Sequence, residues 1–274
     1  MKRVSIFIIL ITILISLLFY PDTYRTAQQV IENSYAAVQL NSYLGEEDPI
    51  LAIDENKIKI VFMFDDGWET VYSEAYPLFQ KYDVKGSVAI IPSIVTQSEY
   101  MSYPQICEIY MQGWDILNHS YTHKEDMYDQ PEEMLIEFNK ASEWMRRNYL
   151  SRCAYMAIIP YGECNPFLIS LLIDSNFNNI RTDSNIITIH NKKTSYYPVR
   201  MISLSSDSYL DHLKHELLIA FKQKTSVLFI LHKIERVDDD FQMTFPPERL
   251  DAILDYIDLN RDKYQVVPYS LLFV

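Results

Sequence analysis

Apolar and polar residues alternate in blocks over most of the chain. Short apolar runs of strand length recur, and between them lie longer stretches with apolar residues at helical spacing. The predicted strands are 58–64, 84–91, 114–118, 154–159, 179–182, 227–231 and 265–267. The predicted helices are 69–82, 103–112, 131–148, 166–174, 209–223 and 247–259. Alternating strands and helices indicate an α/β fold, and about seven parallel strands favour a distorted (β/α) barrel, with an open doubly wound sheet as the alternative.

The first 20 residues follow a different pattern. Lys2 and Arg3 precede VSIFIILITILISLLFY, which contains no charged residue. As a helix this run would span about 26 Å, close to the hydrocarbon thickness of a bilayer. A signal peptide looks similar, but the run is long for one and SLLFYPDTY lacks a small-residue cleavage site. We therefore predict a transmembrane anchor at 1–20, with the N-terminus in the cytoplasm and the rest outside. Cleavage would make the protein secreted.

Residues 21–55 are mostly polar and contain the acidic cluster Glu46, Glu47 and Asp48. We interpret this segment as a stalk or linker, partly helical, that precedes one domain at 56–274.

Composition narrows the possible functions. Hydrophobic residues make up 49% of the chain and the net charge is −13, so we expect a globular protein that does not bind nucleic acid. Cys107, Cys153 and Cys164 show no C-x-x-C spacing, so neither a disulfide framework nor a zinc knuckle is indicated.

Polar clusters follow four of the predicted strands, where functional residues of α/β folds gather. They are FDDG with Asp65 and Asp66, HSYTH with His119 and His123, PYG at 160–162, and LH ending in His232. Adjacent buried carboxylates repel each other and need a positive partner. A turn or a helix cap would explain one of the two acids more easily than both.

A metal ion is the partner that the remaining clusters predict. Histidines at i and i+4 share one face of a helical turn and can meet one ion, although a solvated pair has the same spacing. Two imidazoles and one carboxylate leave open positions for water or substrate. We predict one divalent metal ion, zinc in the first place, with cobalt, nickel or iron also compatible with these ligands.

In this order the four motifs resemble those of the polysaccharide deacetylases of carbohydrate esterase family 4, over about residues 58–270. The resemblance implies a distorted (β/α) barrel and metal-dependent hydrolysis of N-acetyl groups on sugars. It also implies a role for each site residue. Asp66, His119 and His123 would hold the metal, Asp65 would be the general base, His232 the general acid, the Tyr161 backbone N–H would bind the oxyanion, and Leu231 would line the acetyl pocket.

The sequence departs from the family at two points. The family carries an arginine two residues before the proline of its third motif, where it steadies the catalytic aspartate, and here that residue is Ile158. Arg200 is the first candidate for the missing cation and Arg181 the second. The aspartate that orients the acidic histidine is also not evident, with Asp183 and Asp207 as candidates.

These observations predict a membrane-anchored deacetylase of an N-acetylhexosamine polysaccharide outside the cytoplasm. PYGECN at the third motif is similar to the branch of the family that acts on secreted exopolysaccharides. Peptidoglycan is the alternative substrate. A catalytically silent glycan-binding module of a polysaccharide synthase complex is the alternative from another class. The expected partners are the glycan, the membrane, and a membrane polysaccharide synthase.

Overall fold

The computed structural model describes residues 21–43, 52–125, 128–190, 194–237 and 243–274, so the anchor predicted at 1–20 lies outside the described residues. The chain divides into two compact units, Met1–Glu46 and Glu47–Val274. In the first unit, helix α2 (Pro21–Tyr43) runs for 23 residues, within the segment predicted as a stalk. Among the described residues, no helix is long and apolar enough to cross a membrane.

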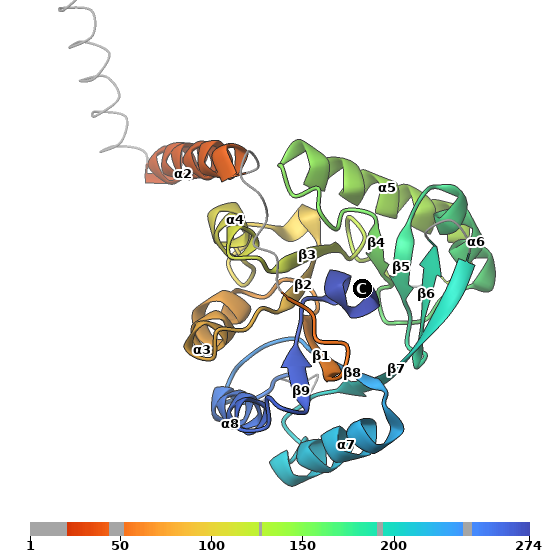
Figure 1. The fold of residues 1–274 in the computed structure, drawn as a ribbon. Coiled ribbons are helices and arrows are strands. Elements are labelled where there is room, and N and C mark those ends of the chain that lie inside the picture. Colours follow the sequence, from red (N-terminus) through yellow and green to blue (C-terminus); the bar gives the residue numbers. More distant parts are fainter. Residues whose placement is uncertain (1–20, 44–51, 126–127, 191–193, 238–242) are drawn as a thin grey trace, which may run out of the picture. The chain divides into compact units, whose positions relative to one another are not determined.

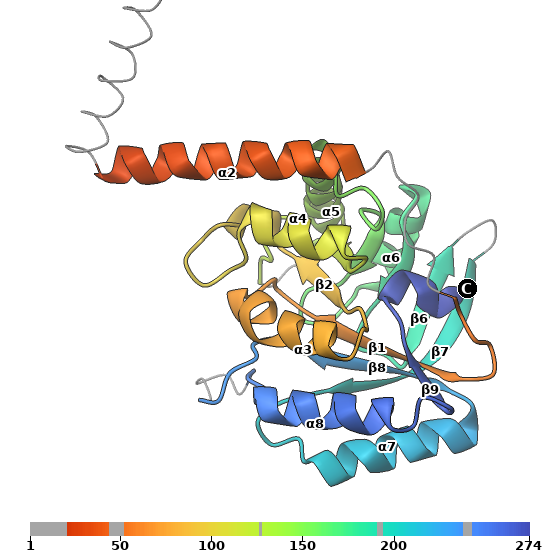
Figure 2. The ribbon, with the colours of Figure 1, turned by 60° about the vertical axis from the view of Figure 1, so that its left-hand side comes forward.

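The second unit is built on a ring of strands (Figures 1 and 2). The strands are β1 (Ile58–Phe64), β2 (Ser87–Ile90), β3 (Asp115–Asn118), β4 (Met156–Ile158), β5 (Asn178–Arg181), β6 (Ile186–His190), β7 (Thr194–Ser203), β8 (Ser226–Leu231) and β9 (Tyr264–Val266). Each strand from β2 to β8 pairs with the next, and β1 pairs with both β8 and β2, which closes a barrel. β9 pairs with the beginning of β1, and β2 pairs with the end of β1. The barrel is therefore closed at the carboxyl end of β1.

The predicted barrel is confirmed, with one correction to its strands. β1 to β5, β7 and β8 all run in one direction, but β6 is inserted between β5 and β7 and is antiparallel to both. The sequence reading missed β6 and β7. β7 contains Pro198 and is mostly half-buried or exposed, so it lacks the continuous apolar run that indicates a buried strand.

Helices surround the strands in both ribbon views. They are α3 (Tyr76–Lys81), α4 (Tyr103–Met111), α5 (Pro131–Arg147), α6 (Pro166–Asp174), α7 (Leu210–Gln223) and α8 (Pro247–Asp258), with the short helical segments η1 (Val71–Ala75), η2 (Pro92–Ile94) and η3 (Tyr269–Phe273). α5, α6 and α8 begin with proline and α4 has proline as its second residue, where the missing N–H costs nothing because a first turn has no partner for it. Asn165 also caps α6 by accepting from the Phe167 N–H. All six predicted helices are present.

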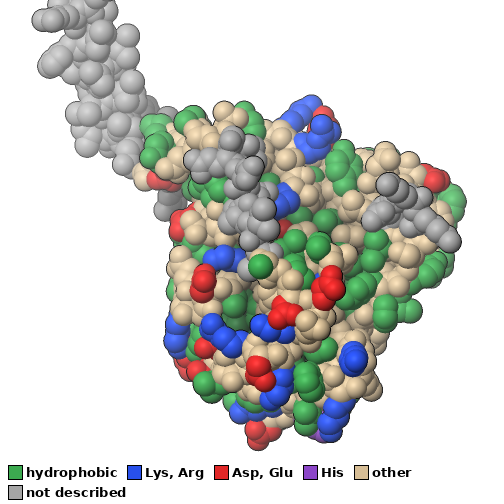
Figure 3. All heavy atoms as spheres, in the orientation of Figure 1, with side chains coloured by type: hydrophobic (Ala, Val, Ile, Leu, Met, Phe, Trp, Pro, Cys, Tyr) green, Lys and Arg blue, Asp and Glu red, His purple; other side chains and the backbone are tan. Residues whose placement is uncertain are grey.

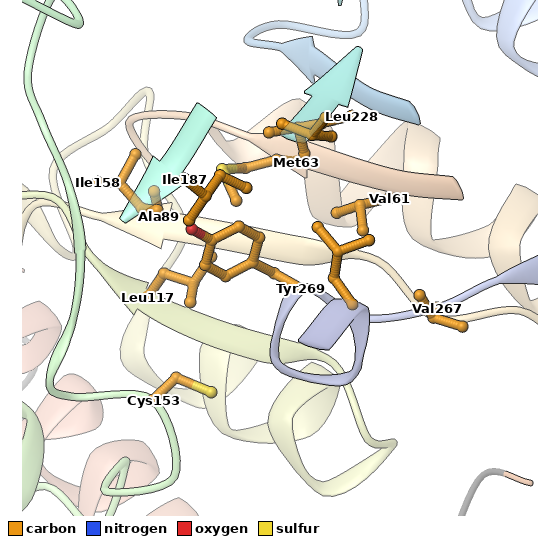
Figure 4. Packing of buried hydrophobic residues seen from close by; sticks show 12 residues of the cluster. Val61, Met63, Ala89, Leu117, Cys153, Ile158, Ile187, Leu228, Val267 and Tyr269 are labelled. Atoms are coloured by element: carbon orange, nitrogen blue, oxygen red, sulfur yellow. The ribbon is translucent and has the colours of Figure 1, made fainter. Parts of the chain in front are cut away.

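The core has one part inside the barrel and one part between the strands and the helices, because successive side chains along a strand point to opposite sides. Val61 and Met63 point into the barrel, where Tyr269 of η3 occupies the centre of the cluster in Figure 4. Phe62 and Phe64, one residue out of step, contact Phe79 of α3 on the outer side. The alternation of side chains along β1 thus decides which of its residues face the barrel interior and which face the surrounding helices.

Candidate active site

The acid pair lies at the carboxyl end of β1. Asp65 follows Met63 with the two-residue period and continues on the inner side of the barrel. Its N–H donates to the carbonyl of Leu231 at 2.8 Å, which extends the pairing with β8 by one residue. Asp66 and Gly67 then adopt φ of 72° and 77°, so the chain turns sharply away from the strand. Both carboxylates line one pocket at this end of the barrel.

The two histidines follow β3, in a tight turn rather than on a helix. The Ser120 N–H donates to Asn118 Oδ1 at 3.0 Å, and the His123 N–H donates to Ser120 Oγ at 3.1 Å. Ser120 and His123 have φ of 62° and 51°, which a helical turn does not allow. The turn still brings the imidazoles together, with ring centroids 4.7 Å apart. The helical geometry predicted from the spacing is therefore wrong, while the expected meeting of the two rings is confirmed.

A buried glutamate holds this turn from outside. Glu137 of α5 is 8% exposed, and its Oε2 accepts from the Thr122 N–H at 2.8 Å and from Thr122 Oγ1 at 2.5 Å. Sequence reasoning missed Glu137. A polar residue at a buried position of an amphipathic helix was the available signal, but nothing in the sequence identified its partner.

Asp66, His119 and His123 form the one cluster of potential metal ligands found among the described residues. Asp66 Oδ1 lies 3.4 Å from His119 Nε2 and 3.5 Å from His123 Nε2. His119 Nδ1 donates to the carbonyl of Ile158 at 2.8 Å, so the neutral imidazole carries its proton on Nδ1 and turns its Nε2 lone pair toward Asp66. The donor set and this tautomer fit a divalent metal ion.

For two of the three ligands, Asp66 and His123, electrostatics favours the protonation state that a metal requires. Burial raises the pKa of Asp66, but the hydrogen bond and charge of His119, with the charges of His232 and His123, outweigh burial and hold that pKa below its usual range. Burial, together with the charge of His119, lowers the pKa of His123 to about 4. At neutral pH the carboxylate is therefore ionised and the His123 imidazole is neutral.

Asp65 forms a buried ion pair with an arginine. Arg181 Nη2 donates to Asp65 Oδ2 at 2.8 Å, and the two residues are 3% and 4% exposed. Arg181 ends β5, and its Cα is paired in register with that of Ile158 on β4. The arginine thus enters the site from the strand beside the position where the family resemblance would place it. Asp65 Oδ1 is buried and has no hydrogen-bond partner among the described residues.

The first candidate for this cation was wrong. Arg200 lies on β7, and its Nε forms an ion pair with Glu216 of α7, on the helix side of the sheet. Residues of β7 that face the pocket are Met201 and Ser203. Arg200 precedes Met201 by one residue, so the alternation of the strand turns its side chain away from Asp65.

The remaining predicted site residues differ in position. His232 and Tyr161 line the pocket of about 270 Å³ that contains Asp65 and Asp66. Leu231 does not line it and is fully buried, because it shares the outer side of β8 with Phe229. The prediction for Leu231 is therefore wrong. The apolar wall is formed by Met201, Ile230 and Met243.

The two candidates for orienting His232 also separate. Asp183 lines the pocket together with His232, whereas Asp207 is not among its lining residues. Within the described part of the chain, neither aspartate makes a hydrogen bond with His232, so the orienting residue stays a prediction.

Residues 52–179 match the model of the family described as polysaccharide deacetylase. The matched residues include the FDDG, HSYTH and PYG motifs, so the chain is similar to this family over residues 52–179. Over 66 residues it is 29% identical to the provisionally named polysaccharide deacetylase YxkH of Bacillus subtilis (strain 168), a match that spans only 24% of each chain.

Solved structures agree with the deacetylase fold. The domain is similar to the Xyl-CE4 domain of a multidomain xylanase from the hindgut metagenome of Trinervitermes trinervoides, with a TM-score of 0.53, 18% identity, and coverage of 80% of this chain and 90% of that one. It is likewise similar to the peptidoglycan deacetylase PdaC from Bacillus subtilis, with a TM-score of 0.53, 17% identity, and coverage of 81% and 92%.

Proposed function

We propose that this domain removes N-acetyl groups from an N-acetylhexosamine polysaccharide by metal-dependent hydrolysis. The observation that carries the proposal is one pocket that combines the Asp66, His119 and His123 cluster with a buried Asp65–Arg181 pair and with His232. Amide hydrolysis needs an activated water, a base and an acid, and this pocket offers a residue for each need.

Asp66, His119 and His123 would hold the metal. When bound there, a divalent ion polarises the amide carbonyl and makes its coordinated water more acidic. Zinc is the first choice because the ligands are two imidazoles and one carboxylate, and the same ligands suit cobalt, nickel or iron.

Asp65 is suited to act as the base. Arg181 holds Oδ2, so the carboxylate cannot rotate freely, and Oδ1 keeps its lone pairs for a proton from the attacking water. The Arg181 guanidinium also gives the buried carboxylate the positive partner that a charge in the interior needs. Arg181 thus does for Asp65 what the arginine of the third motif would do in the family.

His232 is suited to protonate the departing amine, because an amine is a poor leaving group unless it gains a proton. The wall of Met201, Ile230 and Met243 gives the acetyl methyl an apolar surface in the same pocket. The Tyr161 backbone N–H stays our candidate for stabilising the oxyanion.

A second hollow supports a polymeric substrate. Tyr161 lines both the catalytic pocket and a hollow of about 340 Å³ that also contains Tyr128, Lys124 and Glu163. Tyr161 and Tyr128 are 59% and 48% exposed, and exposed aromatic rings offer flat faces to sugars. A glycan held at the metal could therefore continue along this hollow.

Surface charge gives less support for glycan recognition. On the face drawn in Figure 3, basic and acidic side chains are interspersed and form no single acidic patch, although the net charge is −13. We therefore assign recognition to the pocket and the adjoining hollow. The replacement at Ile158 favours a secreted exopolysaccharide over peptidoglycan as the substrate.

The test is acetate release from N-acetylglucosamine oligomers, from an N-acetylhexosamine exopolysaccharide and from peptidoglycan, each with zinc, cobalt, nickel or iron. Asp65→Asn should abolish turnover while the protein still binds metal, and His119→Ala should lose both. No acetate from any of these glycans, with metal bound, would refute the proposal and favour a silent glycan-binding module. If Asp65→Asn loses the metal, the roles of the two aspartates are reversed.

We also propose that the domain works outside the cytoplasm, held by the segment at 1–20 and acting on the product of a membrane polysaccharide synthase. The apolar run at 1–20 and the substrate class support this location. Protease treatment of intact cells should digest the domain. Protection of the domain until the cells are lysed would contradict the proposal.

A further inference from the structure

Trp68 lies in the turn that follows β1 and has no role in the mechanism described so far. It follows Gly67 directly, and its indole Nε1 donates to Asp66 Oδ2 at 3.1 Å. Asp66 therefore uses its two carboxylate oxygens differently. Oδ1 lies near the imidazoles of His119 and His123, at 3.4 and 3.5 Å, and Oδ2 receives the indole N–H.

Contacts on the indole ring fix its position. The ring of Tyr100 stacks on it, with centroids 4.4 Å apart and an angle of 26° between the planes. The Lys233 ammonium lies over the indole at 4.1 Å from its centroid. Trp68 and Tyr100 also form an isolated backbone bridge, and the Met101 N–H donates to the Gly67 carbonyl at 2.9 Å. These contacts leave the half-buried indole little freedom to stack on a sugar.

We propose that Trp68 is a positioning residue for the metal site, because its N–H fixes the Asp66 carboxylate with Oδ1 toward the two imidazoles. A carboxylate on a turn with positive φ has no neighbouring strand to restrain it, so an unheld Asp66 would rotate about its side-chain bonds. Hydrogen bonds that orient a ligand typically change metal affinity by about 10- to 100-fold. The inference rests on the metal site of the proposed function.

The sequence contains a matched control. Trp144 of α5 is also half-buried and contacts a tyrosine, with its ring centroid 6.4 Å from that of Tyr103, but it does not line the catalytic pocket. Trp144→Phe therefore reports the general cost of replacing a tryptophan. Tyr100→Phe keeps the stacked ring and removes only its hydroxyl, so it tests whether the stack needs more than the ring.

The experiment measures zinc affinity by competition with a chelator, and the cobalt absorption spectrum, for purified wild type, Trp68→Phe, Trp144→Phe and Tyr100→Phe. Trp68→Phe should bind zinc about 10- to 100-fold more weakly and show an altered cobalt spectrum. The two control variants should stay within twofold of wild type. Melting temperatures of the metal-free proteins separate this effect from a structural one, because Trp68→Phe should lose more free energy of zinc binding than free energy of unfolding.

Two results would overturn the inference. One is wild-type zinc affinity in Trp68→Phe. The other is equal loss in Trp68→Phe and Trp144→Phe. If Trp68→Phe does not fold, a β-(3-benzothienyl)alanine at position 68 keeps the ring shape without the N–H, and the same affinities decide. Failure of the proposed function looks different, because the wild type itself would then bind no divalent metal.

Discussion

Replacing Arg181 with methionine tests the assignment of the cation that supports the base. Methionine keeps much of the side-chain volume at a position that is 3% exposed, but it removes the charge and the hydrogen bond to Asp65 Oδ2. The Asp65 carboxylate would then be buried without a partner. Breaking a buried pair in this way is more costly than losing a surface ion pair, which is worth at most about 1 kcal/mol.

The size of the effect follows from the geometry. The N–O distance is 2.8 Å, which puts the charge centres about 4 Å apart, and two unit charges at that separation interact by about 4 kcal/mol at an effective dielectric constant of about 20. Since 1.36 kcal/mol corresponds to a factor of ten, losing most of this interaction with the ionised base should lower kcat/KM by about 100- to 1,000-fold.

The assay is acetate release by metal-loaded protein, with kcat and KM determined separately. Arg200→Met is the matched control, and it should stay within about twofold of wild type because Arg200 pairs with Glu216 instead. A second variant tests whether an arginine on β4 can take the place of Arg181 on β5. Ile158 and Arg181 are register partners, so Ile158→Arg in the Arg181→Met background should restore part of the lost activity. Folding of each variant is checked by thermal denaturation.

The reasoning is refuted if folded Arg181→Met keeps kcat/KM within threefold of wild type. It is also refuted if Arg200→Met loses as much activity as Arg181→Met. Loss of activity without rescue by Ile158→Arg would leave the role of Arg181 intact but contradict the interchange of the two positions.

Two further predictions concern the metal-binding turn. Glu137→Ala removes both hydrogen bonds to Thr122, so we expect weaker metal binding and a loss of about 2–3 kcal/mol in the free energy of unfolding, measured by denaturant titration. A metal affinity and an unfolding free energy equal to those of wild type would contradict the supporting role of Glu137. Burial lowers the pKa of His119, but the hydrogen bond with Asp66 and the charges of Asp65 and Asp66 outweigh burial and raise that pKa. Metal binding near neutral pH should therefore release a proton from His119, and metal affinity should weaken as pH falls. Calorimetry in buffers of different ionisation enthalpy measures this release, and none at pH 6.5 would refute it.

The sequence by itself determined the barrel class and the titratable motif residues that line the pocket, Asp65, Asp66, His119, His123 and His232. β1 was predicted with its observed bounds because a buried strand is a continuous apolar run, and the site residues follow such runs in short motifs. Local order is enough for both, since the ends of parallel strands meet at one edge of the sheet. The turn at His119 and His123 shows the limit, because spacing indicated that the rings meet but gave the wrong backbone geometry.

The tertiary structure alone decided which residues serve those motifs from a distance. Arg181 lies 116 positions from Asp65 in the chain, and the pairing of β4 with β5 brings it beside Ile158. The choice between Arg181 and Arg200, and between Ile230 and Leu231 for the pocket wall, depends on which side of its strand each residue occupies. A shift of one residue reverses that side, and the register that fixes it is set by contacts between strands that no local pattern records.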